Sequence, residues 1–160
     1  MVKMSYSQAP HLTDKEIEDF LKEAPTATIC SINEDGTIHG VPVWFKYESG
    51  RFLITTPEKS QKARNIAKNN NVTLIIYVES PDIRGVIVYG KGEVDLTAWD
   101  SEAISMTEKY MSREEAEKWW QILNEHAKWV KITVKPDRMA SFDYTKDNVW
   151  KEMVKKMGWE

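Results

Sequence analysis

Hydrophobic residues recur with a period of two, or in short unbroken runs, over six stretches of the chain, a pattern typical of β-strands. The alternation is clearest where Val41, Val43, Phe45 and Tyr47 share one face. Clusters of Asn, Asp and Gly separate several of these stretches, as expected of turns. The predicted strands span residues 26–32, 37–47, 51–56, 72–79, 85–96 and 128–136.

Two of these strands have distinctive features. Residues 72–79 are apolar almost throughout, which predicts a strand that is buried on both faces. Gly90 and Gly92 interrupt the strand at 85–96 and indicate a bulge or a sharp bend.

Capping residues and helical periodicity predict helices at the margins of the strands. Thr13 with Glu16, and Ser112 with Glu115, form the S/T-x-x-E pattern of a capping box. The predicted helices cover residues 13–23, 60–68 after an N-cap at Ser60, 99–110, a segment that opens at 112, and 148–157 after an N-cap at Asp147.

The order of these elements predicts one α+β domain over residues 1–160 with a mostly β core. Strands and helices do not alternate as a parallel sheet requires, and no internal repeat is present. A six-stranded antiparallel sheet with glycines at its corners predicts a small closed or partly closed barrel with peripheral helices.

Composition narrows the class of protein. The 160 residues are 41% hydrophobic and 29% charged, as in a globular protein, and a formal charge of −3 argues against nucleic-acid binding. No apolar run reaches the ~20 residues that span a bilayer, so we expect no membrane association and a cytoplasmic location. A single cysteine, Cys30, permits no internal disulfide, and three scattered histidines predict no metal site.

The segment TTPEKSQKARN, residues 55–65, places cations where a helix disfavours them. A helix N-terminus carries about half a positive charge, yet Lys59, Lys62 and Arg64 cluster there. Two interpretations stay open. The cations are solvated surface charges, or they complement a bound anion.

In the second interpretation the helix start is a phosphate site without a glycine-rich motif. Ser60, the N–H groups of Gln61 and Lys62, and the Lys62 ammonium supply the donors. The hydroxyl groups of Thr55 and Thr56 are available at the end of the preceding strand.

Proline and tryptophan single out two more places. Pro42 removes a ladder hydrogen bond, which indicates either an edge strand or a point where backbone groups face a ligand. Trp44 points away from the face of Val43 and Phe45, as a lid or an interface residue. Trp150 is interpreted as a docking residue on a short amphipathic helix. No Ser/His/Asp or Cys/His set is present, and no catalytic residue is identified.

The motif Ser-x-Lys-x-x-Asn after a strand that ends in Thr, followed by an apolar strand, resembles the FMN-binding split-barrel family related to pyridoxamine 5′-phosphate oxidase. The similarity spans roughly residues 24–96. The resemblance implies a split β-barrel that forms a homodimer, with FMN in a cleft between the two subunits.

The resemblance also implies which residues bind the cofactor, each on a segment that meets one part of FMN. These are Ser60, Gln61, Lys62 and Arg64 at the phosphate, Thr55 and Thr56 along the ribityl chain, Pro42, Val43 and Trp44 at the isoalloxazine ring, and Trp150 near the C-terminus.

The substrate motif of the oxidase, Arg-Pro-x-x-Ser, is missing, because MSREEAEKWW stands in its place. We therefore expect a flavin-dependent oxidoreductase that acts on another small molecule by hydride or electron transfer. The alternatives are a reductase that uses the deazaflavin F420, and a flavin- or haem-binding module without turnover. For haem, His39 is the only barrel histidine that could serve as an axial ligand.

Overall fold

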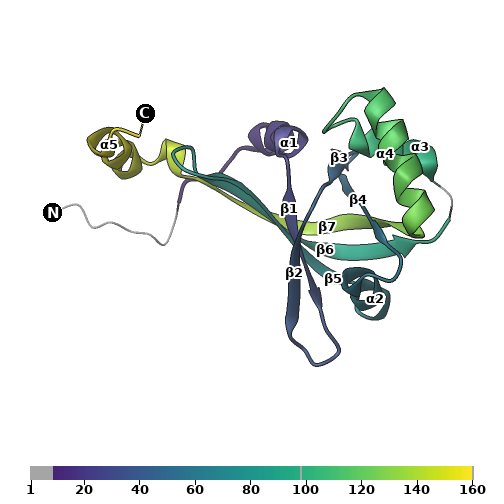
Figure 1. The fold of residues 1–160 in the computed structure, drawn as a ribbon. Coiled ribbons are helices and arrows are strands. Elements are labelled where there is room, and N and C mark those ends of the chain that lie inside the picture. Colours follow the sequence, from purple (N-terminus) through teal and green to yellow (C-terminus); the bar gives the residue numbers. More distant parts are fainter. Residues whose placement is uncertain (1–8, 98, 160) are drawn as a thin grey trace.

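The computed structural model describes residues 9–97 and 99–159, which contain one seven-stranded antiparallel sheet and five α-helices (Figure 1). The strands lie in the order β2-β1-β5-β6-β7-β4-β3. They are β1 (Ala27–Ile32), β2 (Ile38–Val43), β3 (Lys46–Glu48), β4 (Arg51–Pro57), β5 (Asn71–Val78), β6 (Arg84–Asp95) and β7 (Trp129–Asp143). The predicted α+β class is confirmed. Residues 1–8, part of the expected single domain, lie outside the described residues.

The sheet has seven strands rather than the predicted six, because the strand expected at 37–47 is divided in two. β2 pairs with β1, whereas β3 pairs with β4 at the opposite edge of the sheet. Only Trp44 and Phe45 separate β2 from β3, so one continuous segment forms both edges. The sheet must therefore curl until its edges meet at these two residues.

The inner face of the curled sheet holds the main hydrophobic core. Its central side chains have no exposed surface, and each contributes about 1.5–3 kcal/mol through burial. They are Ile29, Phe45, Phe52, Ile54, Leu74, Ile76, Val86, Val88, Ile132 and Val134. Leu21 from α1 (Asp14–Glu23) and Ile66 from α2 (Gln61–Lys68) complete this core and fix both helices on the sheet.

The predicted helix caps are confirmed. Thr13 and Ser112 form capping boxes at the starts of α1 and α4 (Arg113–His126). Ser60 caps α2, and Asp147 caps α5 (Asn148–Met157). α3 (Asp100–Thr107) is shorter than expected, and a 3₁₀ turn, η1 (Tyr144–Lys146), precedes α5. Among residues 9–97 and 99–159, no helix is long and apolar enough to cross a membrane.

β6 and β7 form a long ribbon that carries α5 at its far end, away from α2 and the α3–α4 pair (Figure 1). The register shifts between Tyr89 and Gly90, which confirms the predicted bulge. A Cβ atom at Gly90 would lie 2.3 Å from the Lys135 carbonyl oxygen. Only glycine permits this close approach of two backbones.

The prediction that residues 72–79 are buried on both faces is wrong for the single chain. Leu74 and Ile76 of β5 are fully buried in the core, but Ile75 and Tyr77 on the outer face are 36% and 50% exposed. Thr28 and Ile87 are the strand neighbours of Ile75 on that outer face. The sequence of β5 therefore has two apolar faces, and one of them is open.

Candidate functional site

The predicted anion site lies where β4 ends and α2 begins. The Ser60 Oγ accepts hydrogen bonds from the Ala63 N–H at 3.3 Å and from the Thr56 Oγ1 at 3.0 Å. A serine hydroxyl has two acceptor lone pairs and one proton. Both lone pairs are therefore used, and the Ser60 proton is left for another acceptor at the helix start.

Lys62 is the cation best placed to hold an anion. Its side chain is half-buried, and burial lowers the pKa of its ammonium group. Within the described residues no carboxylate forms an ion pair with it, and the first turn of α2 contains no acidic residue. The first N–H groups of a helix also have no intrahelical acceptor. A partly desolvated lysine in the same helical turn as these donors favours an anionic ligand.

The two other cations of the segment are arranged differently. Lys59 is exposed, as expected of a surface charge. Arg64 folds back along α2, where Nη1 donates to the Lys59 carbonyl oxygen at 2.8 Å and Nη2 donates to Gln61 Oε1 at 2.6 Å. The guanidinium therefore stays at the N-terminal end of α2 and keeps further N–H groups for an anion.

Thr55 and Thr56 lie in different environments. Thr56 is 1% exposed, and its hydroxyl group donates to Ser60, so it acts on the site by orienting the cap. Thr55 is half-buried and is the strand neighbour of Lys131 on β7. Of the two hydroxyl groups, only that of Thr55 lies on a partly accessible side chain.

The chain crosses from one edge of the sheet to the other at Pro42, Val43 and Trp44, in the passage between β2 and β3. β2 is an edge strand, which accounts for the proline. The Val43 side chain is 8% exposed and belongs to the core, so only its backbone can meet a ligand. Trp44 is 38% exposed and points outward, as predicted.

Two residues that the sequence did not single out hold this passage in place. The Tyr110 hydroxyl accepts a hydrogen bond from the Phe45 N–H at 2.8 Å and donates one to the Phe45 carbonyl oxygen at 2.9 Å. The Tyr110 ring stacks on Trp44, with centroids 4.4 Å apart. Lys109 Nζ donates to the same carbonyl oxygen at 3.2 Å. Burial lowers the pKa of the Lys109 ammonium group to about 8. Residues so distant in sequence carry no local signal of this contact.

Trp150 is remote from the α2 site within one chain. Its indole Nε1 donates to the Pro81 carbonyl oxygen at 2.9 Å, and its ring lies 5.8 Å from that of Tyr144, centroid to centroid. α5, which carries Trp150, lies at the far end of the β6–β7 ribbon (Figure 1). A single chain does not bring Trp150 and Lys62 together.

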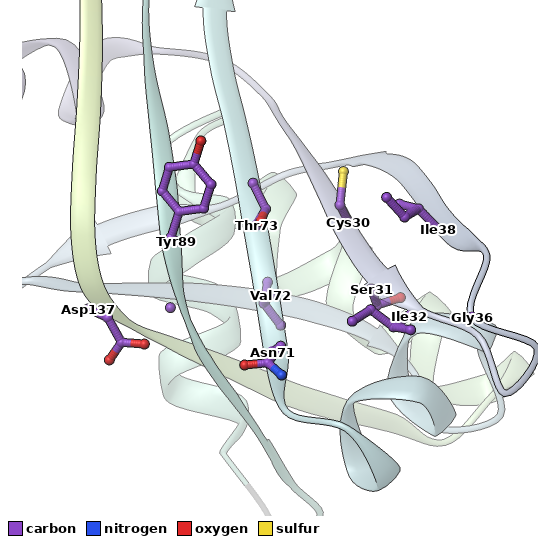
Figure 2. Close-up of a pocket in the computed structure, with 11 residues that line it drawn as sticks. Cys30, Ser31, Ile32, Gly36, Ile38, Asn71, Val72, Thr73, Tyr89 and Asp137 are labelled. Atoms are coloured by element: carbon purple, nitrogen blue, oxygen red, sulfur yellow. The ribbon is translucent and has the colours of Figure 1, made fainter.

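A groove of about 390 Å³ opens on the outer face of the sheet. Cys30, Thr73 and Tyr89 lie on three adjacent strands across it, with Ile38 and Asp137 at its margins (Figure 2). Burial raises the pKa of the Cys30 thiol, so this cysteine is not a reactive thiolate. The groove contains none of the residues predicted to bind the cofactor and belongs to the open outer face.

Residues 13–139 match the family described as pyridoxamine 5′-phosphate oxidase, whereas no curated protein matches the chain significantly. A conserved hypothetical protein of Mycobacterium tuberculosis has 26% identity and a TM-score of 0.72, over 86% of this chain and 88% of its own. An F420 reductase has 21% identity and a TM-score of 0.63, over 79% of this chain and 98% of its own. An FAD-binding protein of Mesorhizobium loti has 14% identity and a TM-score of 0.62, over 83% and 96% respectively.

The similarities to the F420 reductase and to the FAD-binding protein show a shared fold alone. The family match, in contrast, covers α1 and most of the sheet, including the start of α2 and the passage at Trp44. The chain belongs to the pyridoxamine 5′-phosphate oxidase family.

Proposed function

We propose that the protein is a flavoprotein that binds FMN and acts as an oxidoreductase on a small molecule. The observation that carries the proposal is the environment of Lys62. Its half-buried side chain has no carboxylate partner in the described part of the chain, and Lys62 is the second residue of α2, in the turn whose N–H groups are free. The family resemblance supports the same assignment, because it implies that this helix start holds the flavin phosphate.

The residues of the α2 site fit a phosphate group. Ser60 offers its unused hydroxyl proton, and Lys62 offers a charged donor. By the family resemblance, Gln61 stands where many members carry an arginine on the phosphate, and the Arg64 guanidinium donates a hydrogen bond to Gln61 from one turn further along. Arg64 therefore supplies the cation that Gln61 lacks.

The passage between β2 and β3 is assigned to the isoalloxazine ring. Pro42 and Trp44 are exposed there, and the backbone beyond them is fixed by Tyr110. When bound, FMN supplies the hydride or electron transfer. The chain's own residues bind the phosphate and orient the ring, with Thr55 along the connecting ribityl chain, and no residue is assigned as an acid or a base.

We also propose that a second copy of the chain covers the outer face of the sheet. Ile38, which lines the groove in Figure 2, is 72% exposed, and Ile75 and Tyr77 on the outer face of β5 are 36% and 50% exposed. Exposed apolar area of this kind marks an interaction surface, and the apolar outer face of β5 has the sequence of a covered strand. In such a dimer the partner subunit's Trp150 is available to the cofactor site.

F420 is the alternative cofactor, and the similarity in fold to an F420 reductase favours it. F420 carries a longer acidic tail than FMN, so it needs basic residues beyond the phosphate site. Lys59 and Arg64 are exposed cations near the start of α2 that could meet such a tail. A flavin- or haem-binding module without turnover is the other alternative.

The absorbance of the purified protein, and the mass of the cofactor released from it, distinguish these functions. Bound FMN gives an absorbance band at about 450 nm, and F420 gives one at about 420 nm. Reduction of the bound flavin by NADH or NADPH, followed by reoxidation with an electron acceptor, indicates an oxidoreductase. Tight binding without any reduction indicates a binding module. A colourless protein that takes up no added FMN would refute the proposal.

A further inference from the structure

The side chain of Asn65 is buried between α2 and the sheet, with 3% of its surface exposed. Its Nδ2 donates hydrogen bonds to the Ser31 Oγ at 3.1 Å and to the Asn33 Oδ1 at 2.8 Å. Its Oδ1 accepts from the Gln61 Nε2 at 2.7 Å. Both ends of the buried amide are therefore used, and they join α2 to β1 and to the turn after it.

These bonds continue to the start of α2. Gln61 binds Asn65 through its amide nitrogen, and through its amide oxygen it accepts a hydrogen bond from Arg64. One chain of side-chain hydrogen bonds thus runs from Asn33 through Asn65 and Gln61 to the exposed guanidinium of Arg64. This chain fixes the outward-facing groups of the helix relative to the sheet.

We propose that Asn65 is a positioning residue for the anion site at the start of α2, and that the preference for a phosphorylated flavin depends on it. This inference rests on the proposed FMN function. Ala63 and Ile66 bury the apolar side of α2 and hold the helix on the core through an attraction that is itself non-directional. The hydrogen bonds of Asn65 are directional and specify the rotation of α2 about its axis, and with it the direction in which the first N–H groups of the helix point.

The experiment compares FMN with riboflavin, which lacks only the phosphate. The ratio of the riboflavin Kd to the FMN Kd, measured by quenching of flavin fluorescence, isolates the contribution of the phosphate site. In Asn65→Ala we expect this ratio to fall about tenfold, with riboflavin affinity unchanged. A tenfold fall corresponds to the loss of one to two hydrogen bonds between the site and the phosphate. Asn70→Ala, an exposed change near the other end of α2, should keep the wild-type ratio.

Asn33→Ala provides a milder test, because Asn33 lies at the edge of the turn and Asn65 keeps its bond to Ser31. We expect the ratio to fall about two- to threefold, and this variant decides the question if Asn65→Ala does not fold. An unchanged ratio, or an equal loss of affinity for both flavins, would overturn the positioning role and leave the FMN function standing. A wild-type ratio near one would instead overturn the phosphate site itself, and the role of Asn65 with it.

Discussion

Replacing Lys62 with alanine should weaken FMN binding by about 10- to 30-fold. A hydrogen bond to a charged group contributes about 1.5–3 kcal/mol, and 1.4 kcal/mol corresponds to a factor of ten. Burial lowers the pKa of Lys62, so the free protein carries this charge at a cost that an anion removes. The side chain is only half-buried, however, and solvent screens the interaction. The lower half of the range, about 1.5–2 kcal/mol, is therefore the expected loss.

Fluorescence titration of FMN into the wild type and the variants measures this loss. Lys59→Ala is the matched control, because it removes the same charge from an exposed position in the turn just before α2. It should change the FMN Kd by less than about twofold. Riboflavin should bind all three proteins equally. Wild-type affinity in Lys62→Ala, or an equal loss in Lys59→Ala, would refute a direct contact between Lys62 and the phosphate.

Three further outcomes test the rest of the account. Tyr110→Phe removes both hydrogen bonds to Phe45 and should lower the free energy of unfolding, measured in urea, by about 1–3 kcal/mol. The control Tyr144→Phe should change it by less than about 0.5 kcal/mol. Equal effects of the two substitutions would contradict the role of Tyr110 in supporting the passage between β2 and β3. Burial lowers the pKa of Lys109 from 10.5 to about 8, so between these pH values the unfolded chain binds more protons than the folded one. The free energy of unfolding should therefore rise with pH in this window, relative to Lys109→Met, by at most about 1.4 kcal/mol per pH unit. Parallel pH profiles of the two proteins would rule this out. Ile75→Glu places a charge on the outer face and should turn a dimer into a folded monomer in sedimentation, and a monomeric wild type would remove the second-copy proposal.

Local patterns were sufficient to predict the helix starts and most strands. Thr13, Ser60, Ser112 and Asp147 all cap helices as expected, because a cap depends on residues within one turn. Alternation also placed Val43 in the core, together with its neighbours of the same face.

The two wrong predictions concern strands whose partners are set by the tertiary fold and not by the local sequence. The alternation from residue 37 to 47 continues through Trp44, so nothing local shows that the strand changes partners there. β5 was expected to be covered on both faces because its sequence does not reveal whether the second cover is the same chain. The exposed Ile75 shows that the described part of this chain leaves the outer face of β5 open.

The candidate site was predicted in part for the same reason. Ser60 and Lys62 belong to one short segment, and the structure places them together at the start of α2. The contacts of Tyr110 with Phe45, 65 residues apart, and of Asn65 with Ser31, 34 residues apart, depend on how the curled sheet and its helices pack. Such supporting contacts become visible only when the fold is known.

A crystal structure of the protein with FMN would show whether the start of α2 holds the flavin phosphate. We expect the phosphate there, with an oxygen within about 3 Å of Lys62 Nζ and another accepting the Ser60 hydroxyl proton. We also expect the ring beside Trp44 and the cofactor between two copies of the chain. A flavin bound elsewhere, with the start of α2 in contact only with solvent, would contradict the proposal.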